Sequence, residues 1–241
     1  MNSSIVIENL TKYYDDFLAL DNLSLTIEGN ENIGFLGPNG AGKSTTLKIL
    51  CGLLRPTSGK AYINGFNIAS EKEKVLSQIG TIIETTEFYG YLTPAETLSY
   101  LGKLRGMSSD DLRRRIPQVI EMVNLEKWLN IKIEKFSRGM KQRLALAQTL
   151  LHDPPILIFD EPALGLDPRA VIEFRRIIIE AGKDKTVFFA SHQLSEVAQI
   201  CKHVAIIDRG KLLGYDAIEN LERDYGSLEN AYLELTGVPS E

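Results

Sequence analysis

Several residue types are scarce in this chain of 241 residues, and each scarcity excludes a class of protein. The two cysteines, Cys51 and Cys201, are too few for a disulfide framework and fit a reducing compartment. No apolar run approaches the roughly 18 residues of a membrane-spanning helix. Residues 1–10 lack the basic and apolar segments of a signal peptide, so none is expected.

Positive charge is in deficit as well. The 27 Lys and Arg residues against 32 Asp and Glu residues give a formal net charge of −5. A protein that binds the phosphate backbone of nucleic acid is usually basic, so no nucleic-acid partner is expected. The hydrophobic share of 44% is that of an ordinary globular protein, and the length suffices to bury a core.

Short apolar runs and helical stretches alternate in two parts of the chain. Apolar strands bounded by turns are predicted at residues 33–36, 79–83, 156–159, 186–190 and 204–207. This alternation is typical of an α/β fold with a mainly parallel sheet. From Thr93 the chain is helical in character to about residue 150, and Pro117 is predicted to kink or split a helix there.

A glycine-rich segment follows the first of these strands. The sequence Gly37-Pro38-Asn39-Gly40-Ala41-Gly42-Lys43-Ser44 fits the pattern G-x-x-x-x-G-K-[ST]. Glycines let the backbone pass close to phosphate groups, and the N–H groups of such a loop and of the helix after it bind anions. The pattern predicts that Lys43 reaches the β- and γ-phosphates of a nucleotide and that Ser44 coordinates Mg²⁺. An ordinary glycine turn is the alternative.

Two acids and a histidine follow other predicted strands. Asp160 and Glu161 come after the run 156–159, and His192 follows the run 186–190. The carboxyl ends of parallel strands form the ligand-binding edge of a sheet. We therefore predict that Asp160 holds Mg²⁺, that Glu161 polarises the attacking water, and that His192 donates to the γ-phosphate. A solvated strand end and a structural histidine are the alternatives.

These motifs, in this order, resemble the ATP-binding subunit of an ATP-binding-cassette (ABC) transporter, over about residues 5–235. The most specific part is the segment Phe136-Ser137-Arg138-Gly139-Met140-Lys141-Gln142-Arg143, which is similar to the family signature L-S-G-G-Q. The chain looks most like export-type subunits of the drug, bacitracin and lantibiotic-immunity groups. The resemblance implies a phosphate-loop NTPase core of α/β class, with a mainly parallel sheet, an N-terminal antiparallel β region and an inserted helical subdomain.

The resemblance also implies roles outside the three motifs. Tyr14 matches the aromatic residue that stacks on adenine, with Tyr13 as the alternative. Ser137 and Gly139 are implied to contact the γ-phosphate bound by a second copy, and Asp167 lies in the loop that crosses to that copy's site. The full set of implied nucleotide-binding residues is Tyr14, Gly37, Pro38, Asn39, Gly40, Ala41, Gly42, Lys43, Ser44, Thr45, Thr46, Ser137, Gly139 and Asp167.

Two features depart from the family pattern. Arg138 and Met140 stand where the signature usually has Gly and Gln. Arg138 is predicted either to add a charge contact to the partner subunit or a phosphate, or to be a subfamily surface variant. Glu84 stands where the family usually has Gln, as in the lantibiotic-immunity transporters, and is implied to coordinate Mg²⁺ together with Ser44 and Asp160.

Three aromatic residues, Phe88, Tyr89 and Tyr91, follow Glu84 in a segment without helical or strand periodicity. Clustered exposed aromatics often mark an interface. We predict that they receive a short cytoplasmic helix of a separate transmembrane permease subunit. A local core under the helical segment is the alternative.

The sequence thus predicts an enzyme that binds ATP and Mg²⁺ and hydrolyses ATP as the energy-coupling subunit of an exporter. Two chains would close head-to-tail around two ATP molecules, in the cytoplasm and peripherally on the inner face of the cell membrane. The cargo would be a drug, an antibiotic or a peptide; a soluble cassette ATPase, for example in cofactor assembly, is the alternative. The expected single ATPase domain, 1–241, comprises a nucleotide-binding core (1–84 and 155–225), a helical subdomain (85–154) and a C-terminal helical tail (226–241).

Overall fold

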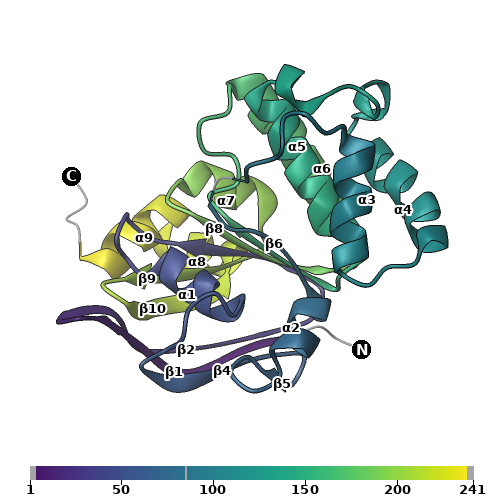
Figure 1. Ribbon diagram of the computed structural model, residues 1–241. Helices are drawn as coiled ribbons and strands as arrows, with labels where there is room; N and C mark the ends of the chain where they lie inside the picture. Colours follow the sequence, from purple (N-terminus) through teal and green to yellow (C-terminus); the bar gives the residue numbers. More distant parts are fainter. Residues whose placement is uncertain (1–3, 85, 238–241) are drawn as a thin grey trace. The chain divides into compact units, whose positions relative to one another are not determined.

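The computed structural model describes residues 4–84 and 86–237 (Figure 1). Its contacts divide the chain into an α/β unit (1–83, 155–161 and 182–241) and a helical unit (84–154 and 162–181). The sequence placed 162–181 in the core, whereas this segment groups with the helices. The parts of the expected domain limits that fall on 1–3, 85 and 238–241 lie outside the described residues, and the domain division stays a prediction.

A six-stranded sheet forms the centre of the α/β unit, in the order β10-β9-β3-β8-β7-β6. Strands β3, β6, β7, β8 and β9 pair in parallel with one another, and β10 pairs antiparallel with β9. Every residue of β7 and β8 is buried, which explains their continuous apolar sequences. The strands are β3 (Asn32–Leu36), β6 (Ile79–Ile82), β7 (Ile156–Asp160), β8 (Thr186–Ser191), β9 (His203–Asp208) and β10 (Lys211–Ala217).

A second, four-stranded sheet in the same unit has the order β2-β1-β4-β5. All its pairs are antiparallel, so the predicted fold class is confirmed. The strands β1 and β2 form a long hairpin in which Tyr14 pairs with Phe17 across a tight turn. The strands are β1 (Ser4–Tyr14), β2 (Phe17–Glu28), β4 (Ser58–Ile63) and β5 (Phe66–Asn67).

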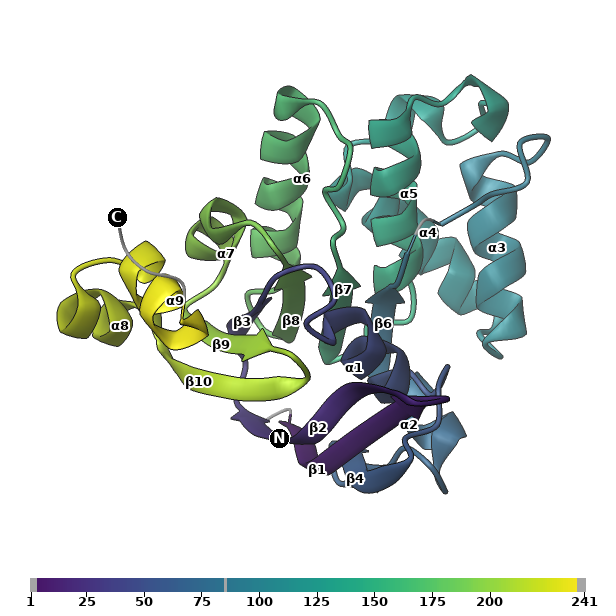
Figure 2. The same ribbon diagram turned by 90° about the vertical axis from the view of Figure 1, so that its left-hand side faces the viewer.

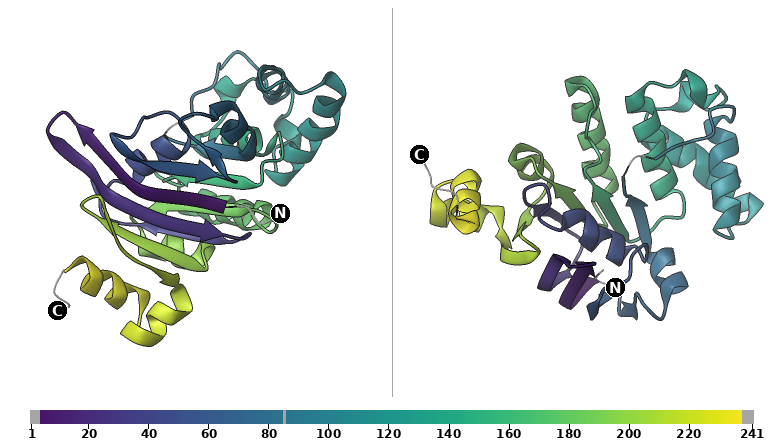
Figure 3. Two further views of the ribbon diagram at one scale, coloured as in Figure 1. Left: turned by 90° about the horizontal axis from the view of Figure 1, so that it is seen from below. Right: turned by 60° about the vertical axis from the view of Figure 1, so that its left-hand side comes forward.

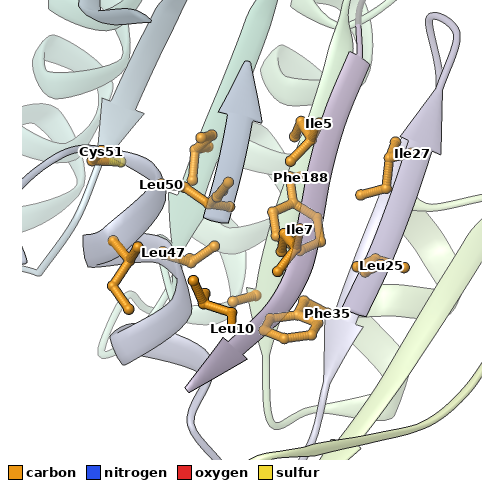
Figure 4. Packing of buried hydrophobic residues seen from close by; sticks show 14 of the residues in the cluster. Ile5, Ile7, Leu10, Leu25, Ile27, Phe35, Leu47, Leu50, Cys51 and Phe188 are labelled. Atoms are coloured by element: carbon orange, nitrogen blue, oxygen red, sulfur yellow. The ribbon is translucent and has the colours of Figure 1, made fainter. Parts of the chain in front are cut away.

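Helix α1 (Lys43–Leu50) packs between the two sheets and shares one apolar core with them (Figure 2). Figure 4 shows side chains of β1, β2 and α1 packed together with Phe35 and Phe188 of the parallel sheet. Leu47 and Leu50 of α1 are fully buried in this cluster. Because α1 begins directly after the glycine-rich loop, burying the helix on both sides fixes the position of the loop.

The remaining helices of the α/β unit are α2 (Lys72–Gln78), α7 (Leu194–Ile200), α8 (Ile218–Tyr225) and α9 (Leu228–Thr236). Helix α7 packs on β3 and β8, and α9 packs on β9 and β10 (Figure 3). The predicted C-terminal tail is therefore helical over 228–236.

The helical unit contains α3 (Pro94–Leu104), α4 (Ser109–Met122), α5 (Arg138–Leu150) and α6 (Pro168–Ala181), with short 3₁₀ turns at Glu126–Trp128 and Ile133–Lys135. Thr93 caps α3 together with Glu96. Helix α4 continues through Pro117, so the proline does not split it, and the alternative of a kink stays a prediction. Buried Leu112, Val119 and Ile120 anchor the helix on either side of the proline. Within 4–84 and 86–237 no helix is long and apolar enough to cross a membrane.

Candidate nucleotide site

The glycine-rich loop joins β3 to α1, and Gly42 is the N-cap residue of that helix. Its φ of 107° lies in the region that favours glycine. A Cβ atom at this position would lie 2.6 Å from Leu20 Cδ2 and 2.8 Å from the Ala19 carbonyl oxygen. The loop can therefore keep its shape against the antiparallel sheet only with glycine here.

Lys43 is buried, with 6% of its surface exposed, although it carries an amine. Its Nζ donates to the carbonyl oxygens of Gly37 (2.6 Å) and Pro38 (3.1 Å). Burial lowers the pKa of this amine, while the charges of Glu161 and Asp160 act in the opposite direction. The amine is thus held within the loop, where a bound phosphate chain would be within its reach.

Asp160 ends β7 and is also buried. The Ser44 hydroxyl donates to its carboxylate, but Oδ1 is buried and has no hydrogen-bond partner among the described residues. Burial raises the pKa of this carboxyl group, against the opposing effects of Ser44 and Lys43. An orphaned carboxylate oxygen beside a hydroxyl group fits a Mg²⁺ ion, which takes oxygen ligands and shares them with substrate phosphates.

No group of three or more His, Cys, Asp and Glu side chains that could hold a metal by itself occurs in the described part of the chain. Glu84, the third predicted metal ligand, is exposed and has a φ of 60°. It belongs to the helical unit, and its metal contact stays a prediction.

Glu161 and His192 meet at the carboxyl ends of β7 and β8. Glu161 Oε1 accepts the backbone N–H of His192 at 2.9 Å and lies 2.8 Å from the ring Nδ1. Lys43 Nζ lies 3.9 Å from the same oxygen. Glu161 has a φ of 46°, a left-handed conformation that costs a side-chain-bearing residue about 1–2 kcal/mol. The fold therefore holds this carboxylate in a strained position.

The backbone around His192 is held by a buried acid that the sequence reasoning missed. Glu196 in α7 is 6% exposed and accepts a hydrogen bond from the Ser191 hydroxyl at 2.9 Å. The same hydroxyl accepts the backbone N–H of Gln193 at 3.0 Å. On a short helix Glu196 looks like an ordinary surface residue, so only its burial reveals the contact.

A cavity of about 240 Å³ lies beside the phosphate loop within the α/β unit. Tyr14 and Phe17 line it from the hairpin tip, and 42% and 64% of their surfaces are exposed. Tyr13 is not among its lining residues, which favours Tyr14 over Tyr13 for the aromatic role. Phe17 was missed, although a two-residue turn after Tyr14 pairs the two residues across the hairpin. The cavity is lined by Tyr14, Phe17, Ala19, Asn39, Gly40, Gly42, Lys43, Ser44, Thr45 and Glu161.

Four predicted loop residues are not among those lining this cavity: Gly37, Pro38, Ala41 and Thr46. Their contacts are internal. The Gly37 and Pro38 carbonyls receive Lys43, Ala41 donates its N–H to the Pro38 oxygen, and Thr46 bonds back to Gly42. These four residues shape the loop.

The predicted signature residues lie at the beginning of α5 in the helical unit. The Ser137 hydroxyl caps this helix by accepting the N–H of Met140 at 3.3 Å, which leaves its own proton available for another acceptor. Gly139 lies in the first turn, where backbone N–H groups have no intrahelical acceptor and attract anions. Asp167 Oδ1 accepts the N–H of Ala170 at 3.0 Å, at the beginning of α6. Nucleotide contact by these three residues stays a prediction.

Comparison with known families decides the identity. The sequence profile of the family described as ABC transporter matches residues 20–164. The chain belongs to the ABC transporter family. Among curated ABC proteins, it is 41% identical to the bacitracin transport ATP-binding protein BcrA of Bacillus licheniformis, over 93% of this chain and 74% of BcrA. It is 34% identical to the linearmycin resistance ATP-binding protein LnrL of Bacillus subtilis, over 96% of this chain and 75% of LnrL.

Solved ABC structures have the same fold. A structure of an ATP-binding subunit of an ABC transporter superposes with a TM-score of 0.85 at 31% identity, covering 96% of this chain and 99% of the other. The ATP-binding cassette MJ0796, a dimer bound to ADP and Pi in a post-hydrolysis state, superposes with a TM-score of 0.78 at 25% identity, covering 88% and 98%. The predicted family and its ATPase activity are confirmed: this ABC protein binds and hydrolyses ATP.

Proposed function

We propose that this ABC ATPase drives a membrane exporter whose cargo is an antibiotic-like compound or a peptide. The names of BcrA and LnrL, which refer to bacitracin transport and linearmycin resistance, support this cargo class. The observation that carries the energy-coupling role is the cluster at one sheet edge, in which Glu161 contacts His192 and lies near Lys43. A chain that only bound nucleotide would not need a strained carboxylate at this place.

The proposed division of labour follows from the contacts within the α/β unit. Lys43 and the loop N–H groups bind the phosphates, and Ser44 with Asp160 holds Mg²⁺. Tyr14 and Phe17 supply an aromatic surface for the adenine base. Glu161 accepts a proton from the attacking water.

His192 connects Glu161 to the γ-phosphate in this proposal. Its Nδ1 lies at hydrogen-bond distance from Glu161 Oε1, so Nε2 is the nitrogen left for a phosphate oxygen. To donate from both nitrogens at once, the ring has to carry both protons.

The complete site is proposed to need a second copy of the chain. Ser137 and the first turn of α5 form a helix N-terminus suited to a phosphate, and they belong to the helical unit rather than to the phosphate loop's unit. In the paired state each chain would offer this N-terminus to the ATP held by its partner. The dimeric structures of the MJ0796 cassette support this arrangement.

A surface for the membrane partner is proposed in the loop before α3. Tyr89 and Tyr91 expose 63% and 64% of their surfaces, and their ring centroids are 5.6 Å apart. Phe88 is half-buried next to them. Backbone bonds from Glu134 N to Gly90 O (2.9 Å) and from Ile133 N to Leu92 O (2.9 Å) hold the loop. Exposed aromatics on a fixed backbone favour docking of a permease helix, which would place the chain on the inner face of the membrane.

The test is co-purification from native membranes. Tagged chain carrying Glu161→Gln, with ATP present, should retain a multi-helix membrane protein in stoichiometric amount. Tyr89→Glu with Tyr91→Glu should abolish that association and leave ATP binding by the purified chain unchanged. As a matched control, Tyr100→Glu changes another half-exposed tyrosine of the helical unit and should not affect association. Recovery of a soluble partner alone would contradict the exporter proposal.

A further inference from the structure

Two side chains of α5 hold the segment after Glu161 by its backbone. Arg138 Nη2 donates to the Leu164 carbonyl oxygen at 2.7 Å, and Gln142 Nε2 donates to that of Pro162 at 2.6 Å. Arg138 and Gln142 are four residues apart in one helix, so their side chains lie on the same face. All these residues belong to the helical unit. The segment is therefore held at two points, two residues apart.

Arg138 is an unfavourable residue for the place where it stands. It is the first residue of α5, and the first turn of that helix contains no acid. A helix N-terminus carries a partial positive charge, which disfavours a cation there. A residue that conflicts with its local structure while making a charge-assisted bond elsewhere points to a role in that bond.

The loop is shaped to receive the guanidinium group. Gly165 has a φ of 73°, and a Cβ atom there would lie 2.5 Å from Arg138 Nη1. The guanidinium therefore fills the space that a side chain at residue 165 would take. The Leu166 N–H donates to the Ala163 carbonyl oxygen at 3.1 Å and closes the turn around Gly165.

We propose that Arg138 and Gln142 are positioning residues that join the segment 162–167 to the signature residues as one rigid element. This inference rests on the proposed function, in which the beginning of α5 acts on the ATP of the partner copy, and on the implied crossing of the Asp167 loop to that copy's site. Because the loop and the beginning of α5 are held together, they would keep a fixed position relative to each other when they reach the partner's site. Arg138 thus acts on turnover by the paired chains and leaves ATP binding by one chain unaffected.

Hydrogen exchange on the full-length chain tests the clamp directly. Arg138→Ala should speed exchange of the Leu166 amide by about tenfold, since a hydrogen bond to a charged group is lost. Lys103→Ala, which removes an exposed basic residue of α3 in the same unit, should leave that exchange unchanged.

Steady-state kinetics tests the positioning role. Arg138→Ala should lower kcat for ATP by about tenfold, with KM and the single-chain affinity for ATP unchanged. Arg138→Lys, which keeps one donor, should recover part of the loss, and Lys103→Ala should behave as wild type. If exchange rises but kcat does not fall, or if neither changes, the proposal is wrong.

Gly165→Ala provides a second route if Arg138→Ala does not fold. The added methyl group should displace the guanidinium and reproduce the loss of kcat. Combined with Arg138→Ala, it should add less than its separate effect, because both changes break the same contact. Additive losses would overturn the proposal. An inactive wild-type chain would contradict the proposed function instead, while the exchange experiment would still test the clamp.

Discussion

Replacing Glu161 by glutamine separates the charge of this side chain from its contacts. Glutamine has nearly the same shape, so its amide oxygen can still accept the His192 backbone N–H, which lies 2.9 Å from Glu161 Oε1. What is lost is the negative charge next to Lys43 and the ability to take a proton. Loss of a general base slows a reaction by about 100- to 10,000-fold, which corresponds to ~3–5 kcal/mol in the barrier.

Phosphate release and ATP affinity should therefore respond differently. Turnover by Glu161→Gln should fall by at least about 100-fold, whereas ATP affinity should stay the same or rise, because a carboxylate near the γ-phosphate repels it. Glu161→Ala is the control for the structural part, since it also removes the acceptor that holds His192. Phosphate release measured at saturating ATP, with fluorescent-nucleotide titration on the same samples, gives both quantities.

The reasoning would be refuted by a Glu161→Gln protein that turns over within a few-fold of wild type. Such a result would mean that Glu161 only anchors His192. A parallel loss of ATP affinity and turnover would mean that the substitution disturbs the phosphate loop, although glutamine has nearly the same shape as glutamate.

Four further predictions concern other parts of the molecule. Tyr14→Ala and Phe17→Ala should each weaken ATP binding by about 5- to 150-fold in calorimetry, since stacking on a base is worth about 1–3 kcal/mol; unchanged affinity would exclude an adenine platform. Cys51 and Cys201 should not react with a thiol reagent until the chain unfolds, because burial raises the pKa of both thiols, that of Cys51 from 9.0 to about 12. The contribution of Cys51 to stability should be complete below pH 9.0 and be lost as the pH rises towards about 12, so the unfolding free energies of wild type and Cys51→Ala should converge there. Glu84→Gln should retain substantial ATPase activity while Glu84→Ala uncouples hydrolysis from transport, and indifference of both activities to Glu84→Ala would remove this residue from the site.

Much of the nucleotide site was predictable because it follows from strand ends. Asp160, Glu161 and His192 each follow a buried apolar run, and parallel pairing brings such ends to one edge. Leu36 pairs with Ser191, and Asp160 pairs with Ala190, so strands β3, β7 and β8 end at the same level of the sheet. The phosphate loop, Glu161 and His192 therefore begin next to one another.

The antiparallel sheet was less predictable. The resemblance implied an N-terminal antiparallel β region without bounds for its strands, and β1 extends over Ser4–Tyr14. Its pairing with β2 shifts register between Ile7 and Leu10, and Asn9 has a φ of 47°. These irregularities interrupt the alternation of apolar and polar residues on which strand prediction depends.

Long-range side-chain contacts were the least predictable. Arg138 was expected to contact a partner or a phosphate, or to be a surface variant; its bond to Leu164 in its own chain, 26 residues away, was not predicted. Spacing along a sequence does not encode such a contact. Tyr89 and Tyr91 are exposed and are not part of a local core. The lack of helical or strand periodicity in this segment could not distinguish between these two alternatives.

The backbone of Glu161 has a practical consequence for engineering this protein. Its φ of 46° is a conformation that glycine adopts freely, so Glu161→Gly should relieve strain while it deletes the carboxylate. Selection for thermal stability alone would therefore enrich Glu161→Gly variants, which have lost the carboxylate and with it the ATPase activity. Stability and turnover are opposed at one residue, and any screen for robust variants has to select for phosphate release at the same time.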